Sequence, residues 1–311
     1  MEQPSITAED YFKPGHLGCP GCGAAIALKF ALKVLGEKTI MVIPASCASI
    51  IVGPYPLSAV KIPILHTAFA TAGAAASGVR AALDLKGHTE TTVVSWAGDG
   101  GTFDIGFQSL SGAVERNEDC IFVCYDNEAY MNTGVQRSSS TPFGVRTTTT
   151  PGQNWKKTRK KNIMESMAAH RIPYAATASI AFPEDLMAKF EKAKASKGGA
   201  RFIHIFASCA TGWGAPSDMS VKIARLAVQT NIFPLYEIED GIRYALNYKG
   251  DRPVKDYLQT QKRFEHLSDA DISQIQDMVA EDWALLLRKA GDAPSGPQQS
   301  GNSRDDLKIK S

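Results

Sequence analysis

The chain has 311 residues, of which 44% are hydrophobic, with 34 basic and 32 acidic side chains. This length suffices for one large α/β domain or two small ones, each with a substantial core. Because the charges nearly cancel, no overall field attracts nucleic acid or a membrane. The chain has no apolar run long enough to span a membrane, and its start lacks the features of a signal peptide. We therefore expect a soluble globular protein of the cytoplasm.

Apolar strand-like runs alternate with helical stretches rich in small residues along the first 240 residues. This alternation predicts an α/β fold with a mostly parallel sheet and helices on both faces. In chain order, the predicted elements are a helix at about 23–35, a strand at 39–44, a helix at 68–83, a strand at 91–97, a helix at 104–116 and strands at 120–125 and 201–207.

Two further segments complete the predicted organisation. Residues 131 to about 153 form a loop rich in Gly, Ser, Thr and Pro, which is too long to serve only as a connection. A helix start at Ser268 and apolar residues at helical spacing predict a packed C-terminal helix up to about residue 290. We expect residues 1–290 to form a single domain and residues 291–311 to form a flexible tail.

Two short motifs directly follow predicted strands. The turn Gly98-Asp99-Gly100 comes after the strand at 91–97, and Asp126-Asn127-Glu128 comes at the end of the strand at 120–125. The carboxyl ends of parallel strands lie at one edge of a sheet, where α/β proteins bind their ligands. We therefore expect the two motifs to meet at one site.

The glycine turn suits a diphosphate that is held through a cation. A nicotinamide-type phosphate loop would need glycine where the chain has Phe103, and a carboxylate beside a diphosphate repels it. A divalent cation removes this conflict, with oxygens from Asp99, Asn127 and the backbone near Ala129 as ligands. The glycines let the backbone approach, and the start of the next helix favours phosphate charge. The alternative is a tight turn that is capped by Asp99 and binds no ligand.

Four of the six cysteines lie at predicted turns and strand ends. Cys19 and Cys22 form a C-x-x-C motif, whereas Cys47 and Cys209 follow the strands at 39–44 and 201–207. Six cysteines in a chain of this length are too few for a disulfide scaffold. Four thiolates at one sheet edge suit a tetrahedral zinc ion or a [4Fe–4S] cluster, and C-x-x-C alone also suits a redox dithiol. The spacing does not choose among these sites.

The stretch GDGGTFDIGFQSLSGAVERN…YDNEAYMNTGVQRSSSTPFG resembles the β subunit of pyruvate:ferredoxin oxidoreductase and its relatives. Within it, GDG followed about 27 residues later by asparagine resembles the thiamine-diphosphate signature. The similarity covers roughly residues 12–267. It implies that residues 1–290 adopt a diphosphate-type thiamine-diphosphate-binding fold with an N-terminal cluster-binding segment and a C-terminal helix.

The resemblance also implies cofactors and their ligands. Thiamine diphosphate would bind through Mg²⁺, with Asp99 and Asn127 as side-chain ligands and Ala129 as a carbonyl ligand. Asn132 would be a catalytic residue near the thiazolium and the reacting carbon. A [4Fe–4S] cluster would accept single electrons, which zinc cannot do. The implied cofactor-binding residues are Gly98, Asp99, Gly100, Asn127, Ala129 and Asn132, and the implied cluster ligands are Cys19, Cys22, Cys47 and Cys209.

The implied activity is oxidative decarboxylation of a small 2-oxoacid, with electrons passed through the cluster to ferredoxin. Thiamine enzymes also need a glutamate on a pyrimidine-binding domain, which is not recognisable in this sequence. We therefore expect a partner α subunit to complete the site, and ferredoxin-like or γ subunits to relay electrons to external ferredoxin. We expect neither nucleic acid nor a membrane among the partners.

One departure from the pyruvate-type pattern bears on the substrate. The chain has Phe69-Ala70-Thr71 where that pattern has a Phe-Glu-Asn run. Loss of a potential carboxylate favours a more anionic substrate, so we place oxalate slightly ahead of pyruvate. Pyruvate would require coenzyme A and would give acetyl-CoA. A thiamine enzyme without redox chemistry and a non-catalytic zinc-bearing assembly subunit are the two alternative classes.

Several other polar residues have a structural and a functional interpretation. Cys120 and Cys124 lie within one predicted strand and are interpreted as small buried side chains. His16 and His66 are interpreted as structural, with substrate or cofactor binding as the alternative. The basic run at 156–161 is interpreted as a solvated face, with docking of an acidic ferredoxin or of coenzyme A phosphates as the alternative. No aromatic platform or known module indicates nucleic-acid binding.

Overall fold

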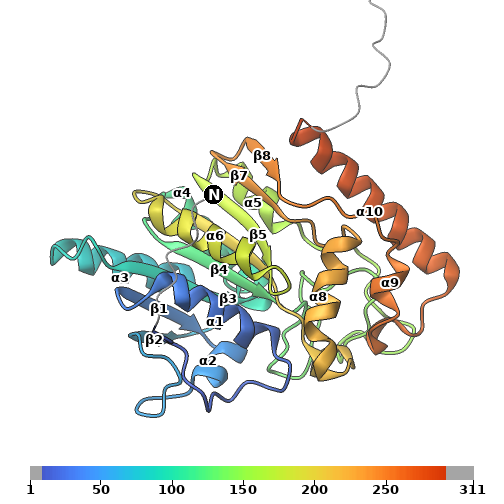
Figure 1. Ribbon diagram of the computed structural model, residues 1–311, viewed down its shortest axis with the longest axis horizontal. Helices are drawn as coiled ribbons and strands as arrows, with labels where there is room; N and C mark the ends of the chain where they lie inside the picture. Colours follow the sequence, from blue (N-terminus) through green and yellow to red (C-terminus); the bar gives the residue numbers. More distant parts are fainter. Residues whose placement is uncertain (1–8, 292–311) are drawn as a thin grey trace, which may run out of the picture.

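The structure, a computed structural model, describes residues 9–291. Its strands form one eight-stranded sheet in the order β2-β1-β3-β4-β6-β5-β7-β8 (Figure 1). Each pair of neighbours from β2 to β5 in this order is parallel. Strand β7 pairs with β5 antiparallel, and β8 pairs with β7 antiparallel. The prediction of a mostly parallel sheet is confirmed. The strands are β1 Thr39–Pro44, β2 Ile64–Thr67, β3 Thr92–Gly98, β4 Ile121–Asp126, β5 Tyr174–Ser179, β6 Arg201–Phe206, β7 Tyr236–Glu239 and β8 Arg243–Leu246.

Helices cover both faces of this sheet (Figure 1). Strand β1 shows why its sequence is a continuous apolar run: Met41 and Ile43 enter one core, while Val42 enters the other. A parallel strand that is buried on both faces needs apolar side chains at successive positions. The first core is completed by α1 Gly23–Leu35, α2 Cys47–Val52, α6 Pro183–Ala195 and α8 Ser220–Gln229, and the second by α3 Ala72–Leu85, α4 Phe107–Glu115 and α5 Ile163–Ala169.

The long helix α10, Asp269–Lys289, lies along one side of the molecule, as predicted (Figure 1). Ser268 begins it with a capping box, in which its side chain accepts from the Asp271 amide and Asp271 accepts from the Ser268 amide. Two short helices, α7 Ala210–Trp213 and α9 Lys255–Leu258, precede it. Between residues 9 and 291, no helix has the length and apolar content that crossing a membrane requires.

Several predicted boundaries differ from the structure. Helix α1 and strand β1 have the predicted limits, and the helix predicted at 104–116 is α4, Phe107–Glu115, which a π-helical turn, Gly100–Asp104, precedes. The chain is crowded there, because a β-carbon on Gly106 would lie 2.0 Å from the Gly101 carbonyl oxygen. The predicted helix at 68–83 begins later, at Ala72. The tail predicted at 291–311 lies outside the described residues, apart from Gly291.

The register of the sheet brings the sequence motifs to one edge. Gly98 at the end of β3 pairs with Tyr125 of β4, so Asp99 follows beside Asp126. Asp126 in turn pairs with Phe206 at the end of β6, three residues before Cys209. Strand β1 ends nearby at Pro44, three residues before Cys47. This carboxyl edge is therefore the candidate site.

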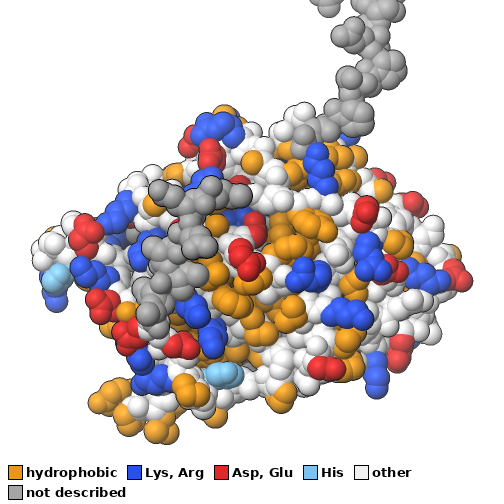
Figure 2. All heavy atoms as spheres, in the orientation of Figure 1, with side chains coloured by type: hydrophobic (Ala, Val, Ile, Leu, Met, Phe, Trp, Pro, Cys, Tyr) orange, Lys and Arg blue, Asp and Glu red, His pale blue; other side chains and the backbone are white. Residues whose placement is uncertain are grey.

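Charged side chains of both signs are interspersed over the face shown in Figure 2. Neither lysine and arginine nor aspartate and glutamate forms a large field of one sign on this face. Attraction of charged ligands to this face therefore depends on local groups, and not on a net field.

Candidate functional site

Three polar groups from the two strand-end motifs converge. The Asn127 side-chain amide lies 3.0 Å from Asp99 Oδ1 and 3.1 Å from the Ala129 carbonyl oxygen, and its nitrogen donates to both in the orientation that satisfies its hydrogen bonds. With the amide rotated by 180°, its oxygen would face the same two acceptors, and a cation between the three oxygens would satisfy all of them. Octahedral Mg²⁺ with oxygens at about 2.0–2.1 Å separates neighbouring ligands by about 2.9 Å. The three atoms therefore have a spacing that a hard divalent cation can occupy.

The carboxyl group of Asp99 is buried, with 1% of the residue exposed. Ser138 Oγ donates a 2.5 Å hydrogen bond to Asp99 Oδ2. Burial and the neighbouring Asp126 raise the pKa of Asp99 well above its ordinary value. A cation at the three oxygens would favour the ionised form, because opposite charge offsets the cost of burial.

A cavity of about 100 Å³ opens beside these groups. It is lined by both motifs and by Asn132, the residue predicted to lie near the reacting carbon. Cys47 and Phe69 also line it. The cavity is therefore lined both by the proposed cofactor-binding motifs and by one of the proposed cluster ligands. The lining residues from the predicted set are Gly98, Asp99, Gly100, Asn127, Ala129, Asn132 and Cys47.

The glycine at position 100 is required by close packing within the cavity wall. A β-carbon there would lie 2.5 Å from two ring carbons of Tyr130. Gly101 differs, because a β-carbon there would make ordinary contacts at 3.6 Å or more. The ring of Tyr130 stands edge-on to Phe69, with centroids 5.6 Å apart. Gly100 therefore lets an aromatic ring close one side of the cavity.

The four predicted cluster cysteines come from three separate segments. Cys22 precedes α1, Cys47 begins α2 and Cys209 precedes α7, while Cys19 lies in the N-terminal loop. Cys209 Sγ accepts a hydrogen bond from the Gly212 amide at 3.3 Å. Three of the four cysteines thus stand at the starts of helices.

The thiols are close enough to influence each other's ionisation. Burial, and then Cys209, Cys22, Asp99 and Cys19, raise the pKa of Cys47 to about 12. Burial, with smaller effects of Cys22 and Cys19, raises the pKa of Cys209 to about 11. Positive charge from bound metal would be needed to hold these four sulfurs together as thiolates.

The remaining cysteines and the two ambiguous histidines lie elsewhere. Cys120 and Cys124 are fully buried in the core, as predicted. His16 stacks on Phe12 with ring centroids 4.7 Å apart, and its Nδ1 accepts from the Gly18 amide. His66 is exposed on strand β2. Neither histidine is among the residues that line the cofactor cavity.

The prediction that the basic run at 156–161 is a solvated face is wrong for Lys156, and Lys160 and Lys161 are only partly exposed. Lys156 is buried, and its Nζ donates to backbone carbonyls of Ser139, Thr141 and Arg159. Lys161 donates to the Phe103 carbonyl. The ammonium groups of these lysines point inward because backbone carbonyl oxygens behind the site are buried and need hydrogen-bond donors.

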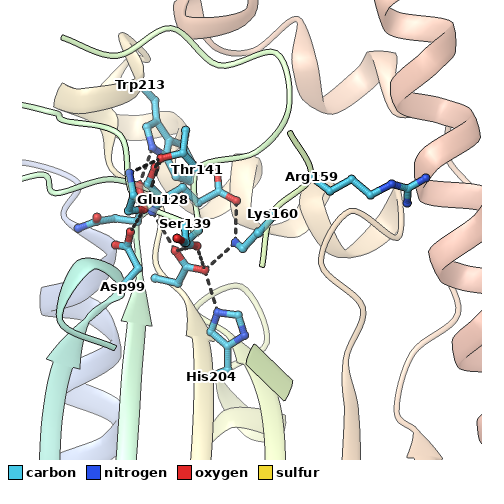
Figure 3. A network of polar contacts seen from close by, with 12 residues as sticks. Asp99, Glu128, Ser139, Thr141, Arg159, Lys160, His204 and Trp213 are labelled. Atoms are coloured by element: carbon cyan, nitrogen blue, oxygen red, sulfur yellow. Dashed lines mark hydrogen bonds and ion pairs between the residues drawn. The ribbon is translucent and has the colours of Figure 1, made fainter. Parts of the chain in front are cut away.

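Lys160, the third of these lysines, joins a network of polar contacts behind the candidate metal site (Figure 3). Its Nζ lies 2.6 Å from Asp126 Oδ2 and 3.1 Å from Glu128 Oε1. His204 Nε2 lies 2.8 Å from the same oxygen of Asp126. Although burial opposes it, Lys160 and His204 lower the pKa of Asp126 below its ordinary value. Asp126 is therefore held as a carboxylate inside the protein.

Sequence reasoning missed several members of this network. His204 lies within β6 and carries no motif, and Arg263 lies in a 3₁₀ turn far along the chain. Arg263 Nη2 lies 2.6 Å from Glu128 Oε2, and Thr141 Oγ1 donates to the Glu128 carbonyl at 2.7 Å. The sequence offered one signal of this network, the charged residue Glu128 directly after a buried strand. A glutamate that is buried at such a position needs a charged partner.

Fold and site together define a thiamine enzyme, and comparison with known proteins agrees. The sequence model of the family "Thiamine pyrophosphate enzyme, C-terminal TPP binding domain" matches residues 45–205, which contain both strand-end motifs. The solved 2-oxoglutarate:ferredoxin oxidoreductase of Magnetococcus marinus has a similar fold, with a TM-score of 0.54 and 21% identity over 72% of this chain and 80% of that chain.

Comparison with curated relatives narrows the family to which the chain belongs. The ketoisovalerate oxidoreductase subunit VorB of Pyrococcus furiosus is 50% identical over 298 residues, which are 92% of this chain and 95% of the relative. The pyruvate synthase subunit PorB of Methanothermobacter thermautotrophicus is 50% identical over 278 residues, 88% and 96% respectively. The chain therefore belongs to the thiamine-pyrophosphate-binding subunits of the 2-oxoacid:ferredoxin oxidoreductase family. Both relatives are named for 2-oxoacids other than oxalate, and they give the expected preference for oxalate no support.

Proposed function

We propose that this chain binds thiamine diphosphate through Mg²⁺ and carries a [4Fe–4S] cluster in a complex that oxidatively decarboxylates a short 2-oxoacid. The observation that carries the proposal is the convergence of the Asn127 side-chain amide on Asp99 Oδ1 and the Ala129 carbonyl oxygen, at 3.0 and 3.1 Å. At the carboxyl edge of a parallel sheet, beside a cavity, these three groups can each offer an oxygen to a cation that binds a diphosphate.

The bound thiamine supplies the carbanion that adds to the oxo carbon of the acid. The residues of this chain position it. Asp99, Asn127 and Ala129 would hold the Mg²⁺, and Gly98 and Gly100 leave the backbone open to the diphosphate. Asn132, exposed on the cavity wall, is the candidate to contact the reacting end of the cofactor.

The chemistry supports a cluster more than a single zinc ion. Oxidative decarboxylation releases electrons that must be passed on singly, and an iron–sulfur cluster can accept them whereas zinc cannot. We assign Cys19, Cys22, Cys47 and Cys209 as the ligands of the cluster.

The substrate we propose is a 2-oxoacid with an uncharged side chain, of the size of pyruvate or ketoisovalerate, with coenzyme A as acyl acceptor. The names of two relatives that are each 50% identical support this class. Phe69, in the segment that departs from the pyruvate-type pattern, lines the cavity beside Tyr130. Two aromatic rings favour contact with an apolar group over a second carboxylate.

Partner chains are part of the proposal. A pyrimidine-domain α subunit would supply the activating glutamate, and ferredoxin-like or γ subunits would carry electrons to external ferredoxin in the cytoplasm. The chain alone should therefore not turn over any 2-oxoacid, whereas the complex should.

Anaerobic purification of the complex from its native host tests these proposals together. We expect co-purifying chains, about four iron and four sulfide per [4Fe–4S] cluster assigned to this subunit, and thiamine with Mg²⁺. Acceptor reduction should proceed with pyruvate or ketoisovalerate and require coenzyme A. Turnover with oxalate in the absence of coenzyme A would reverse the substrate proposal. Zinc without iron, and no thiamine, would indicate a non-catalytic assembly subunit; thiamine without iron would indicate a non-redox thiamine enzyme.

A further inference from the structure

The turn that carries the candidate Mg²⁺ ligands is held from behind by buried side chains (Figure 3). We propose that Lys160, Arg263 and Thr141, here called the turn clamp, are positioning residues that fix residues 126–129 in the metal-binding geometry. The inference rests on the proposed function, because it concerns the same metal site.

The backbone of the turn is the first reason. Glu128 has φ of +66°, a left-handed conformation that residues other than glycine rarely adopt. Such a conformation persists only where surrounding contacts determine it. It directs the chain so that the Ala129 carbonyl oxygen faces the Asn127 amide at 3.1 Å. If Glu128 relaxed to an ordinary conformation, the three oxygens would no longer converge.

Three hydrogen bonds hold the peptide groups of the turn. The Glu128 amide donates to Asp126 Oδ1 at 2.9 Å, and Thr141 Oγ1 donates to the Glu128 carbonyl at 2.7 Å. Trp213 Nε1 donates to the Asn127 carbonyl at 2.9 Å. The backbone between the two metal ligands is therefore fixed by side chains from distant parts of the chain.

Buried charge holds the side chains of the same turn. Glu128, 2% exposed, lies between Lys160 Nζ at 3.1 Å and Arg263 Nη2 at 2.6 Å. Lys160 also binds Asp126, so two carboxylates meet two cations. The Arg263 guanidinium further lies 3.8 Å from the Trp213 ring centroid, which steadies the indole that contacts Asn127.

The turn clamp acts through the turn and not on the ligand. Its three residues are not among those lining the cofactor cavity. Removing the Lys160 charge would leave the buried carboxylates of Asp126 and Glu128 without the cation that they share. Glu128 would then turn away from this position, and the left-handed backbone would lose its support. The expected result is weaker metal binding in a chain that still folds.

Metal binding by the whole complex tests this inference. The anaerobically purified complex is stripped with EDTA, and Mn²⁺ binding with excess thiamine diphosphate is followed by the EPR signal of free Mn²⁺. We expect Lys160→Met to weaken Mn²⁺ binding by about 10- to 100-fold, as for other residues that support metal ligands. Lys160→Arg should recover most of the affinity, because it restores the charge.

Lys189 provides a matched control. It is buried, lies 2.7 Å from Asp185 and donates to the Thr177 carbonyl at 2.8 Å, far from the metal ligands in sequence. Lys189→Met should lower the melting temperature while leaving the Mn²⁺ affinity unchanged. Equal loss of affinity in both methionine variants would mean that Lys160 stabilises the fold only, and would overturn the inference.

The remaining outcomes are also decisive. Wild-type affinity in a folded Lys160→Met complex would overturn the turn clamp while leaving the proposed function intact. A wild-type complex that binds thiamine diphosphate without any divalent metal would overturn both. If Lys160→Met does not fold, Thr141→Val decides, because at nearly constant shape it removes the hydrogen bond to the Glu128 carbonyl, together with the one that Oγ1 accepts from the Ser138 amide. It should bind Mn²⁺ about fivefold more weakly, and unchanged affinity would again contradict the inference.

Discussion

The Gly23 amide donates a 3.0 Å hydrogen bond to the Ser208 carbonyl, which ties the residue after Cys22 to the residue before Cys209. A β-carbon at position 23 would lie 2.6 Å from the Ser208 backbone. The N-terminal C-x-x-C segment and the loop after β6 therefore meet with no space for a side chain. This contact sets the separation of two proposed cluster ligands.

Gly23→Ala should consequently lower the iron content of the anaerobically purified complex by at least half, because backbone atoms cannot yield to the added methyl group. Gly78→Ala is the control: it lies in α3 with nothing within 4 Å of the added carbon. That change should keep full iron content and raise helix stability by up to about 1 kcal/mol. Full iron content in Gly23→Ala would show that this contact does not position the ligands.

Replacing any of the four proposed cluster ligands by alanine should lose or convert the cluster, since a cubane needs all its thiolates. Iron analysis and the EPR signal of the reduced complex measure this. Cys120→Ala and Cys124→Ala should keep the cluster, because both thiols are fully buried in the other core. An unchanged signal in Cys209→Ala would remove Cys209 from the ligand set.

Asp99→Ala should abolish Mg²⁺-dependent binding of thiamine diphosphate, because it removes the one charged ligand of the proposed cation. Titration of the stripped complex by calorimetry measures the affinity. The fold should survive, since burial already makes ionised Asp99 costly. Asp84→Ala, which removes an exposed carboxylate of α3, should bind the cofactor normally. Near-normal affinity in Asp99→Ala would rule out this metal site.

Gly100→Ala and Gly101→Ala form a matched pair in one turn. At position 100 the methyl group meets the Tyr130 ring at 2.5 Å, whereas at position 101 its nearest neighbour is at 3.6 Å. We expect Gly100→Ala to weaken thiamine diphosphate binding by about tenfold or more, from about 1–3 kcal/mol of overpacking. Gly101→Ala should bind within about threefold of wild type. Indistinguishable affinities in the two variants would contradict the role given to Tyr130.

The ligands of the proposed cation were accessible to sequence reasoning because Asp99 and Asn127 directly follow consecutive parallel strands. Strand ends fix position along a sheet, so two local motifs suffice to predict that they meet. The residues that hold the turn between these ligands could not be predicted from local motifs. Lys160 and Arg263 reach Glu128 across 32 and 135 residues, and nothing local marks either as its partner.

Burial of polar residues explains the incorrect prediction. A run such as 156–161 is normally solvated, because lysine is seldom buried without a partner. Here the partners are the Asp126 carboxylate at the end of β4 and the carbonyls of Thr141 and Phe103, so three lysines point inward. Strand β5, YAATAS, was missed for the opposite reason: its small side chains lack the branched apolar pattern of a strand, yet all six are buried between neighbouring strands and helices.

The contact between Arg263 and Glu128 also has a consequence for biosynthesis. Because it closes a loop of 135 residues, it forms only after most of the chain has collapsed. Asp99 and Asn127 leave the ribosome long before Arg263 does. We expect nascent chains truncated before residue 263 to retain no metal, although they contain every ligand. Cofactor loading would then be confined to chains whose synthesis has passed that point.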